Sequence, residues 1–187
     1  MSQEVREKLC KNAGSHGLWV GLFPEFSEEL LATRELVLAL NKEPGFKETI
    51  EPTQLHITLS HLGRSSPARR AECAMSAMEM AASLIRDERR ISVEGFIRLP
   101  NHLGFILAPE QILKLRDQLN LCLADQDIRV DDTFAGIPHM TLGKFRYNSD
   151  IARCPFIKPF KLTFRGLAIV SGDARVYAPF SDPGLMF

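Results

Sequence analysis

The sequence carries no excess of charge of either sign, because 23 lysines and arginines stand against 23 aspartates and glutamates. Proteins that coat long nucleic acids have a large positive excess, since their affinity comes from neutralising many phosphates. We therefore expect no coating of long nucleic acid. If the chain binds nucleic acid, it should bind a nucleotide or an end.

Long apolar runs and closely spaced cysteines are also missing. No segment approaches the ~20 apolar residues that span a bilayer, and residues 1–15 alternate charges where a signal peptide is apolar. The four cysteines are too far apart for a zinc knuckle or a redox motif, and disulfide frameworks are typical of short secreted chains. We therefore expect no membrane association, reduced thiols and a cytoplasmic location. The cysteines are Cys10, Cys73, Cys122 and Cys154.

The composition that is present is that of a globular protein. Hydrophobic residues make up 45% and charged residues 25%, which excludes a disordered or fibrous chain. The 187 residues suffice for one large domain or two small lobes. We expect a monomer.

A strand followed by a helix occurs twice in the pattern. Residues 18–23 and 102–108 are apolar runs of strand length, each ended by a proline. Residues 26–40 and 111–123, which follow them, have apolar side chains at helical spacing. Proline suits this place, because its fixed φ and missing N–H fit the first turn of a helix.

Each of these units then leads to a second strand that contains His-x-Thr-Leu. His56 lies 32 residues after Pro24, and His139 lies 30 residues after Pro109. The same tetrapeptide at nearly the same point of two similar units indicates a duplication.

The remaining segments complete an α+β pattern. A helix is predicted over residues 67–87 and strands over residues 91–99, 160–170 and 175–180. Together these predicted strands and helices indicate a bilobal duplicated fold, in which each lobe is an antiparallel sheet with helices on its outer face. The active-site cleft is expected between the lobes. Residues 1–17 are expected to be an N-terminal extension and residues 18–187 a single bilobal domain.

The two tetrapeptides place polar side chains on one strand face. Side chains alternate along a strand, so His56 and Thr58 point the same way, as do His139 and Thr141, while the apolar residues between them point to the core. With five histidines in the chain, about 0.2 His-x-Thr matches are expected by chance. Two matches at equivalent places therefore favour function over a structural strand histidine.

Two imidazoles and two hydroxyls around one cleft suit phosphodiester hydrolysis without a metal. One histidine takes a proton from the attacking water and the other donates one to the leaving oxygen, each role contributing about 10²–10⁴-fold. Threonine hydroxyls can hold the non-bridging phosphate oxygens, where charge develops.

Zinc is the competing use of paired histidines. His56 and His61 are five residues apart, so regular strand alternation predicts that His61 faces away from the cleft and that the two share no ion. No carboxylate stands beside either tetrapeptide to complete a zinc site. We therefore expect no metal and no cofactor.

These residues resemble the paired motifs of the 2H phosphoesterase superfamily. The flanking sequence is similar to its LigT-like branch, the RNA 2′,3′-cyclic phosphodiesterases. Residues 51–59 resemble the first motif of that branch, residues 138–142 the second, and residues 18–22 the opening strand. The resemblance covers about residues 18–180.

The resemblance implies a bilobal α+β fold with a V-shaped cleft and metal-independent hydrolysis of a 2′,3′-cyclic phosphate at RNA ends or on nucleotides. By motif position it assigns His56 and His139 to acid–base catalysis, with His139 as the base and His56 as the acid. It assigns Thr58 and Thr141 to phosphate binding.

One departure from the branch leaves the substrate open. Ser60 and His61 stand where the branch usually has a basic and then an aromatic residue, whereas Lys144 matches a basic residue after the second motif. A phosphodiesterase of signalling nucleotides, either 2′,5′-oligoadenylate or cyclic dinucleotides, is the first alternative. A nucleotide- or RNA-binding domain without turnover is the second, although it would not need two proton-transfer groups.

Four further residues are candidates for substrate binding. Trp19 and Phe23 share a strand face and either stack on a nucleobase or pack in a core. Matching Pro24 to Pro109 places slimmer residues, Gly104 and Ala108, at their positions in the second unit. The other two candidates are Lys144, for a phosphate, and Tyr177, which stands where the family often has a tyrosine.

Overall fold

The computed structural model describes residues 2–40, 46–64, 67–85, 89–99, 101–131, 137–145 and 158–180. Its helices are α1 (Gln3–Ala13), α2 (Glu28–Leu40), α3 (Ala68–Leu84) and α4 (Pro109–Ala124), with one 3-10 turn, η1 (Pro52–Gln54). Its strands are β1 (Gly17–Pro24), β2 (Phe46–Thr49), β3 (Ile57–Arg64), β4 (Arg90–Leu99), β5 (His102–Leu107), β6 (His139–Phe145), β7 (Phe160–Ser171) and β8 (Ala174–Pro179).

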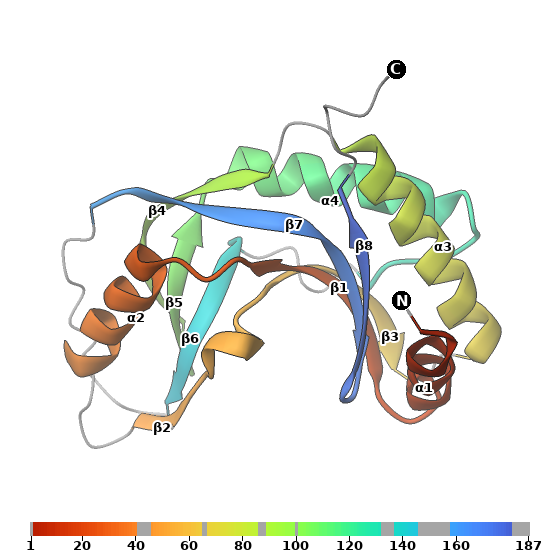
Figure 1. The fold of residues 1–187 in the computed structure, drawn as a ribbon, viewed down its shortest axis with the longest axis horizontal. Helices are drawn as coiled ribbons and strands as arrows, with labels where there is room; N and C mark the ends of the chain where they lie inside the picture. Colours follow the sequence, from red (N-terminus) through yellow and green to blue (C-terminus); the bar gives the residue numbers. More distant parts are fainter. Residues whose placement is uncertain are drawn as a thin grey trace.

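The strands form one antiparallel sheet in the order β2-β6-β5-β4-β7-β1-β3, with β8 also paired to β7. The long strand β7 joins the two lobes, because its first four residues pair with β4 and the rest pairs with β1 and β8. The sheet bends into two arms, one with β4, β5, β6 and β2 and the other with β1, β3 and β8 (Figure 1). The predicted α+β bilobal fold is confirmed, with the difference that the two sheets are continuous.

The helices lie outside the arms, and the core lies between them and the sheet. Helices α1 and α3 pack on each other and on β7 and β8, α4 packs on α3 and β3, and α2 lies beside β6 (Figure 1). One apolar cluster runs through both lobes. Among the described residues, no helix combines the length and the apolar character needed to cross a membrane.

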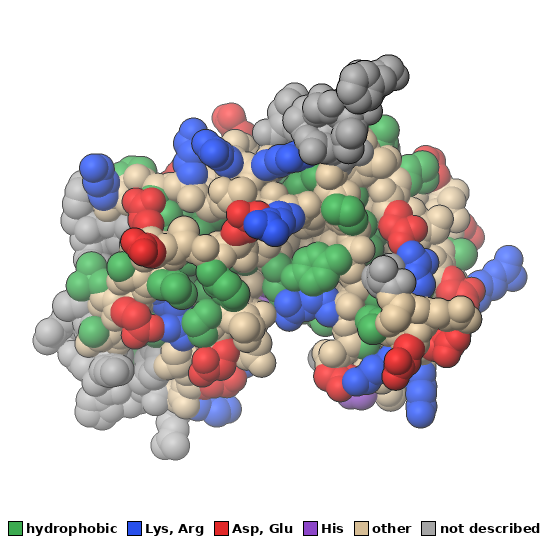
Figure 2. Space-filling model, viewed as in Figure 1, with side chains coloured by type: hydrophobic (Ala, Val, Ile, Leu, Met, Phe, Trp, Pro, Cys, Tyr) green, Lys and Arg blue, Asp and Glu red, His purple; other side chains and the backbone are tan. Residues whose placement is uncertain are grey.

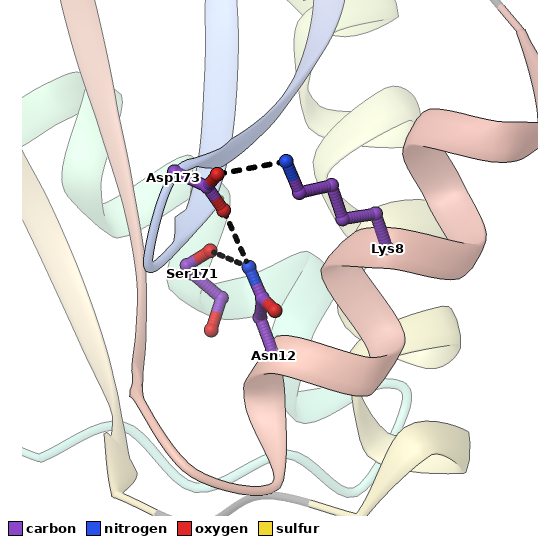
Figure 3. Close-up of polar contacts among 4 residues, drawn as sticks. All are labelled: Lys8, Asn12, Ser171 and Asp173. Carbon is purple, nitrogen blue, oxygen red and sulfur yellow. Dashed lines mark hydrogen bonds and ion pairs between the residues drawn. The ribbon is translucent and has the colours of Figure 1, made fainter.

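Helix α1, which lies in the predicted N-terminal extension, is part of the packed structure. Its Leu9 and Ala13 are fully buried. The Asn12 side-chain amide donates to the carbonyl oxygen of Ser171 at 3.1 Å and to Oδ1 of Asp173 at 3.0 Å. Lys8 Nζ lies 2.7 Å from Oδ2 of Asp173, so α1 holds the turn between β7 and β8 (Figure 3).

Candidate active site

Both motif histidines are held by the same kind of hydrogen bond, from the ring to a backbone carbonyl. His56 Nδ1 donates to the carbonyl oxygen of Gln54 at 2.7 Å, and His139 Nδ1 donates to that of Ile137 at 2.8 Å. A carbonyl oxygen only accepts, so in each neutral ring the proton is on Nδ1 and Nε2 is the free acceptor. The two rings are therefore prepared alike for proton transfer at Nε2.

The structure brings the four motif residues to one cleft of about 230 Å³. His56 and Thr58 line it from the β3 side, and His139 and Thr141 line it from β6. Figure 2 shows the molecule hollowed at the lower edge between the two arms. Of the described residues, no group of three or more histidines, cysteines, aspartates or glutamates is placed to hold a metal ion.

Each motif strand has a β-bulge directly after its threonine. In β3 the partner of Gly21 is Thr58 and the partner of Val20 is Ser60, so Leu59 is an extra residue. In β6, Gly104 pairs with Thr141 and Leu103 with Gly143, so Leu142 is extra in the same way. A bulge of this kind shifts the alternation of side chains by one residue.

The bulge in β3 overturns the prediction that His61 faces away from the cleft. His61 pairs with Trp19, and Thr58 pairs with Gly21, two residues further along β1. Residues two apart on a strand share a face, so His61 and Thr58 lie on the same face. His61 accordingly lines the cleft with His56. Regular alternation therefore gives no argument against a shared ion.

The equivalence of the two units also differs from the one predicted by matching prolines. The register pairs Trp19 with His61 and His102 with Lys144, so Trp19 corresponds to His102 rather than to Gly104. By the same offset, Phe23 corresponds to Ile106 rather than to Ala108. The reason is that Pro24 still pairs with Phe164 as a strand residue, whereas Pro109 already opens α4.

The two units share a glycine opposite each motif threonine. A Cβ on Gly21 would lie 2.4 Å from the carbonyl oxygen of Ile57, and one on Gly104 would lie 2.5 Å from that of Met140. Each motif strand therefore passes its neighbour too closely for any side chain at this position.

Trp19 and Phe23 lie on the cleft face of β1, outside the main core. They belong to a separate small cluster with Ala168 and Val170. The His56 ring packs against both of them, with its centroid 4.5 Å from that of Trp19 and 5.6 Å from that of Phe23.

Tyr177 extends this surface, and Arg175 covers it. The Tyr177 ring is 5.9 Å from that of Phe23, edge to face, and is 45% exposed. Arg175 Cζ lies 3.6 Å above the Phe23 ring. We call Trp19, Phe23 and Tyr177 the aromatic shelf. A groove of about 200 Å³ continues from it, lined in part by Phe23, Phe26, Arg175 and Tyr177.

Lys144 lies on the same strand face as Thr141, but it pairs with another residue. Its Nζ is 3.2 Å from Oε2 of Glu48 on the neighbouring strand β2. The described residues that line the cleft do not include Lys144. The ammonium group has further donors beside the one that Glu48 accepts, so the phosphate contact of Lys144 stays a prediction.

Burial and positive neighbours make three cleft imidazoles less basic. Burial lowers the pKa of His56, and the positive charges at Arg175, His139 and His61 lower it further. The hydrogen bond to Gln54 acts in the opposite direction and raises this pKa. Burial also lowers the pKa of His61, with Asp131 opposing it. For His102, burial and the charges at His139 and Lys144 lower the pKa. These rings are therefore neutral over more of the range near pH 7 than ordinary histidines.

Sequence reasoning missed three charged or titratable residues of the cleft wall: His61, His102 and Arg116. Arg116 lies on α4, one turn before Asn120, whose Oδ1 accepts the hydroxyl of Ser60 at 2.7 Å. That bond anchors α4 beside the β3 bulge. Matching the units through Gly21 and Gly104 would have indicated His102, but nothing local in the sequence indicates Arg116.

Comparisons with known proteins place the fold. No protein-family model matches the chain. No curated protein matches it by sequence. A solved structure of TT0787 from Thermus thermophilus matches with a TM-score of 0.62 and 21% identity, covering 88% of this chain and 95% of that one.

Two further solved structures are similar. Escherichia coli LigT complexed with 3′-AMP matches with a TM-score of 0.54 and 18% identity, over 89% of this chain and 95% of LigT. The MHV ns2 PDE domain matches with a TM-score of 0.53 and 15% identity, over 81% of this chain and 100% of that domain. The chain therefore has the fold of the LigT-like 2H phosphoesterases, as its motifs predict.

Proposed function

We propose that this chain is a 2H phosphodiesterase that hydrolyses 2′,3′-cyclic phosphates at RNA ends or on nucleotides without a metal. The observation that carries the proposal is the pair of equivalent histidines, each of which donates from Nδ1 to a backbone carbonyl. Both histidines line one cleft, each together with the threonine of its own motif. The solved structures of similar fold support it, since they include a phosphoesterase and a PDE domain.

In the proposed reaction, one histidine accepts a proton from water through Nε2 while the water oxygen attacks phosphorus. The other donates a proton to the ribose oxygen as its bond to phosphorus breaks, so the ring opens to a phosphate monoester. The hydroxyls of Thr58 and Thr141 hold the non-bridging oxygens, whose charge grows in the transition state. Following the resemblance, His139 is the base and His56 the acid.

The binding of nucleotides by a similar protein agrees with this substrate class. LigT has been crystallised with 3′-AMP, a phosphate monoester of a nucleoside, and with phosphate. In this chain Phe23 lies under Arg175, so Trp19 and Tyr177 are the rings of the aromatic shelf that can stack on the base of a nucleotide whose phosphate is in the cleft.

The test is hydrolysis in the presence of EDTA. The protein is incubated with 2′,3′-cyclic mononucleotides, 2′,5′-oligoadenylate and cyclic dinucleotides, and the products are identified by chromatography. We expect ring opening of the cyclic phosphates, unaffected by EDTA. Loss of activity with EDTA would contradict the metal-free mechanism. Nucleotide binding without hydrolysis of any of these compounds would identify a binding domain.

A further inference from the structure

The cleft holds three cationic or titratable side chains that the acid–base pair and the threonines do not use. They are His61, His102 and Arg116, and they come from β3, β5 and α4. None of the described residues that line the cleft is acidic. A wall of this kind attracts anions, and Asp131, the acidic group that acts on His61, is not among the described residues that line the cleft.

Each of the three side chains is fixed by a different structural element. The β3 bulge turns His61 into the cleft opposite Trp19, and the β5–β6 register places His102 opposite Lys144. Arg116 is carried by α4, which the Ser60–Asn120 hydrogen bond ties to the bulge. The three are therefore presented by rigid elements rather than by a loop.

The volume of the cleft limits what it can contain. At about 230 Å³ it is smaller than the ~300 Å³ at the lower end of sites for drug-sized molecules. It suits phosphate groups and part of a ribose, so the base must lie outside. Within the aromatic shelf, Phe23 is covered by Arg175, so the exposed Tyr177 ring and the groove beyond it offer the surface for the base.

We infer that His61, His102 and Arg116 form a second anion subsite, which binds a phosphate next to the one that reacts. The inference rests on the proposed function and narrows its substrate class. The preferred substrate is a nucleotide or oligonucleotide that carries at least one phosphate beyond the cyclic one.

The protonation of His61 and His102 offers a second way to detect binding at the subsite, through proton uptake. Burial lowers the pKa of His61 and of His102, and the groups acting on them are Asp131 for His61 and His139 and Lys144 for His102. A bound phosphate favours the charged imidazolium and raises the pKa again. Binding of a second phosphate is therefore coupled to proton uptake.

The experiment compares two ligands that the protein cannot hydrolyse as phosphodiesters, adenosine 3′,5′-bisphosphate and 3′-AMP. Calorimetry measures both Kd values for the wild-type protein and for the His61→Asn, His102→Asn and Arg116→Gln variants. We expect the bisphosphate to bind about tenfold tighter than 3′-AMP, in line with added charge-assisted hydrogen bonds. Each variant should lower this ratio at least about threefold, because the Kd for the bisphosphate should rise more than the Kd for 3′-AMP.

The matched control is Lys114→Gln, which removes an exposed positive charge from the same helix as Arg116. It should keep the wild-type ratio, and the melting temperature of every variant verifies folding. Titration in two buffers of different ionisation enthalpy should show proton uptake with the bisphosphate that falls in both histidine variants. A purely structural role of these histidines would leave the uptake unchanged.

Two outcomes overturn the inference: a wild-type ratio near one, or a ratio that the three variants do not change. The proposed function fails separately. If no phosphodiester is hydrolysed but the bisphosphate preference is present and depends on Arg116, the subsite stands and the enzyme proposal falls. If cyclic mononucleotides are hydrolysed without any such preference, the reverse holds.

Discussion

At the scale of single residues, the two motif histidines share their hydrogen bond but not their surroundings. His56 lies against Trp19 and Phe23, and the charge of Arg175 lowers its pKa. His139 lies near His102 on the other arm. The same imidazole is therefore placed in two electrostatic settings. The lowered pKa of His56 favours the neutral ring, whereas the acid must be protonated, so the assignment of His56 as the acid rests on the resemblance alone.

Replacing each motif histidine should show which one is the acid. His56→Ala and His139→Ala should each lower kcat about 10²–10⁴-fold on a 2′,3′-cyclic substrate, and the double variant should lose less than the product. On a phosphodiester with a nitrophenolate leaving group, which departs without a proton, His56→Ala should recover most of its activity. His139→Ala should not, because it lacks the base. Recovery by His139→Ala instead would exchange the two roles.

The charge of Arg175 should be measurable in the titration of His56. Arg175 lowers the pKa of His56, so Arg175→Gln should raise it and keep the ring protonated to higher pH. The measurement is an NMR titration of the His56 ring in the unliganded protein. Arg165→Gln, which removes a more exposed arginine, is the control and should leave the titration unchanged. A His56 pKa that falls or stays constant in Arg175→Gln would contradict the assignment.

At the scale of elements, each motif strand combines a bulge with a glycine on the neighbouring strand. The bulge at Leu59 turns His61 toward the cleft, the bulge at Leu142 puts Lys144 on the face of Thr141, and Gly21 and Gly104 allow the strands to approach. The positions of His61 and of the two threonines thus depend on pairs of strands rather than on either strand alone.

Alanine at either of these glycines should damage both stability and activity. The added Cβ would meet a backbone carbonyl, and at Gly21 also the Trp19 ring, so Gly21→Ala and Gly104→Ala should each cost about 1–3 kcal/mol. The displaced motif strand should lower kcat as well. Gly95→Ala is the matched control, since it lies in β4 with no atom near its Cβ. Urea unfolding and steady-state kinetics measure both effects, and a neutral Gly21→Ala would contradict the close approach.

Much of this arrangement could be predicted from the sequence, because the motifs and the apolar periodicity are local signals. The order of the main strands and helices follows from them, and so does the meeting of His56 with His139 in one cleft. Helix α1 and the four-residue strand β2 were not predicted, since the first is highly charged and the second too short for a period.

The facing of His61 could not be predicted for a different reason. A bulge is a property of a strand pair, and the sequence from His56 to His61 is compatible with regular alternation. The equivalence of Trp19 with His102 was missed because a proline can end one strand inside the sheet and open a helix after another. Both errors arise where tertiary pairing, rather than local pattern, decides the geometry.

At the scale of the whole molecule, strand β7 and helix α1 hold the parts together. Strand β7 runs through both arms, and α1 fixes its turn to β8 through Asn12 and Lys8. Since α1 packs on α3 and β8 outside the arms, its contribution should be to stability rather than to the chemistry (Figure 1).

Shortening a buried side chain of α1 tests this division. Leu9 is fully buried, so Leu9→Ala should lower the free energy of unfolding by about 2–5 kcal/mol, while kcat of the folded protein stays within about twofold. Leu36→Ala is the control, because Leu36 is 51% exposed on α2 and should cost little. Denaturant unfolding gives the stability, and kinetics are measured well below the melting temperature. An unaltered stability in Leu9→Ala would show that α1 is not part of the cooperative fold.

The equivalence of the two units has a consequence for descent. One unit carries one motif histidine, and the proposed hydrolysis uses two, so a half-length ancestor could have completed this site only as a two-fold dimer of identical chains. Such a dimer must present the same residue from both halves. Fusion in one chain removes that restriction, and positions 19 and 102 now hold tryptophan and histidine. The joined chain can therefore give its substrate a direction, which two identical halves cannot.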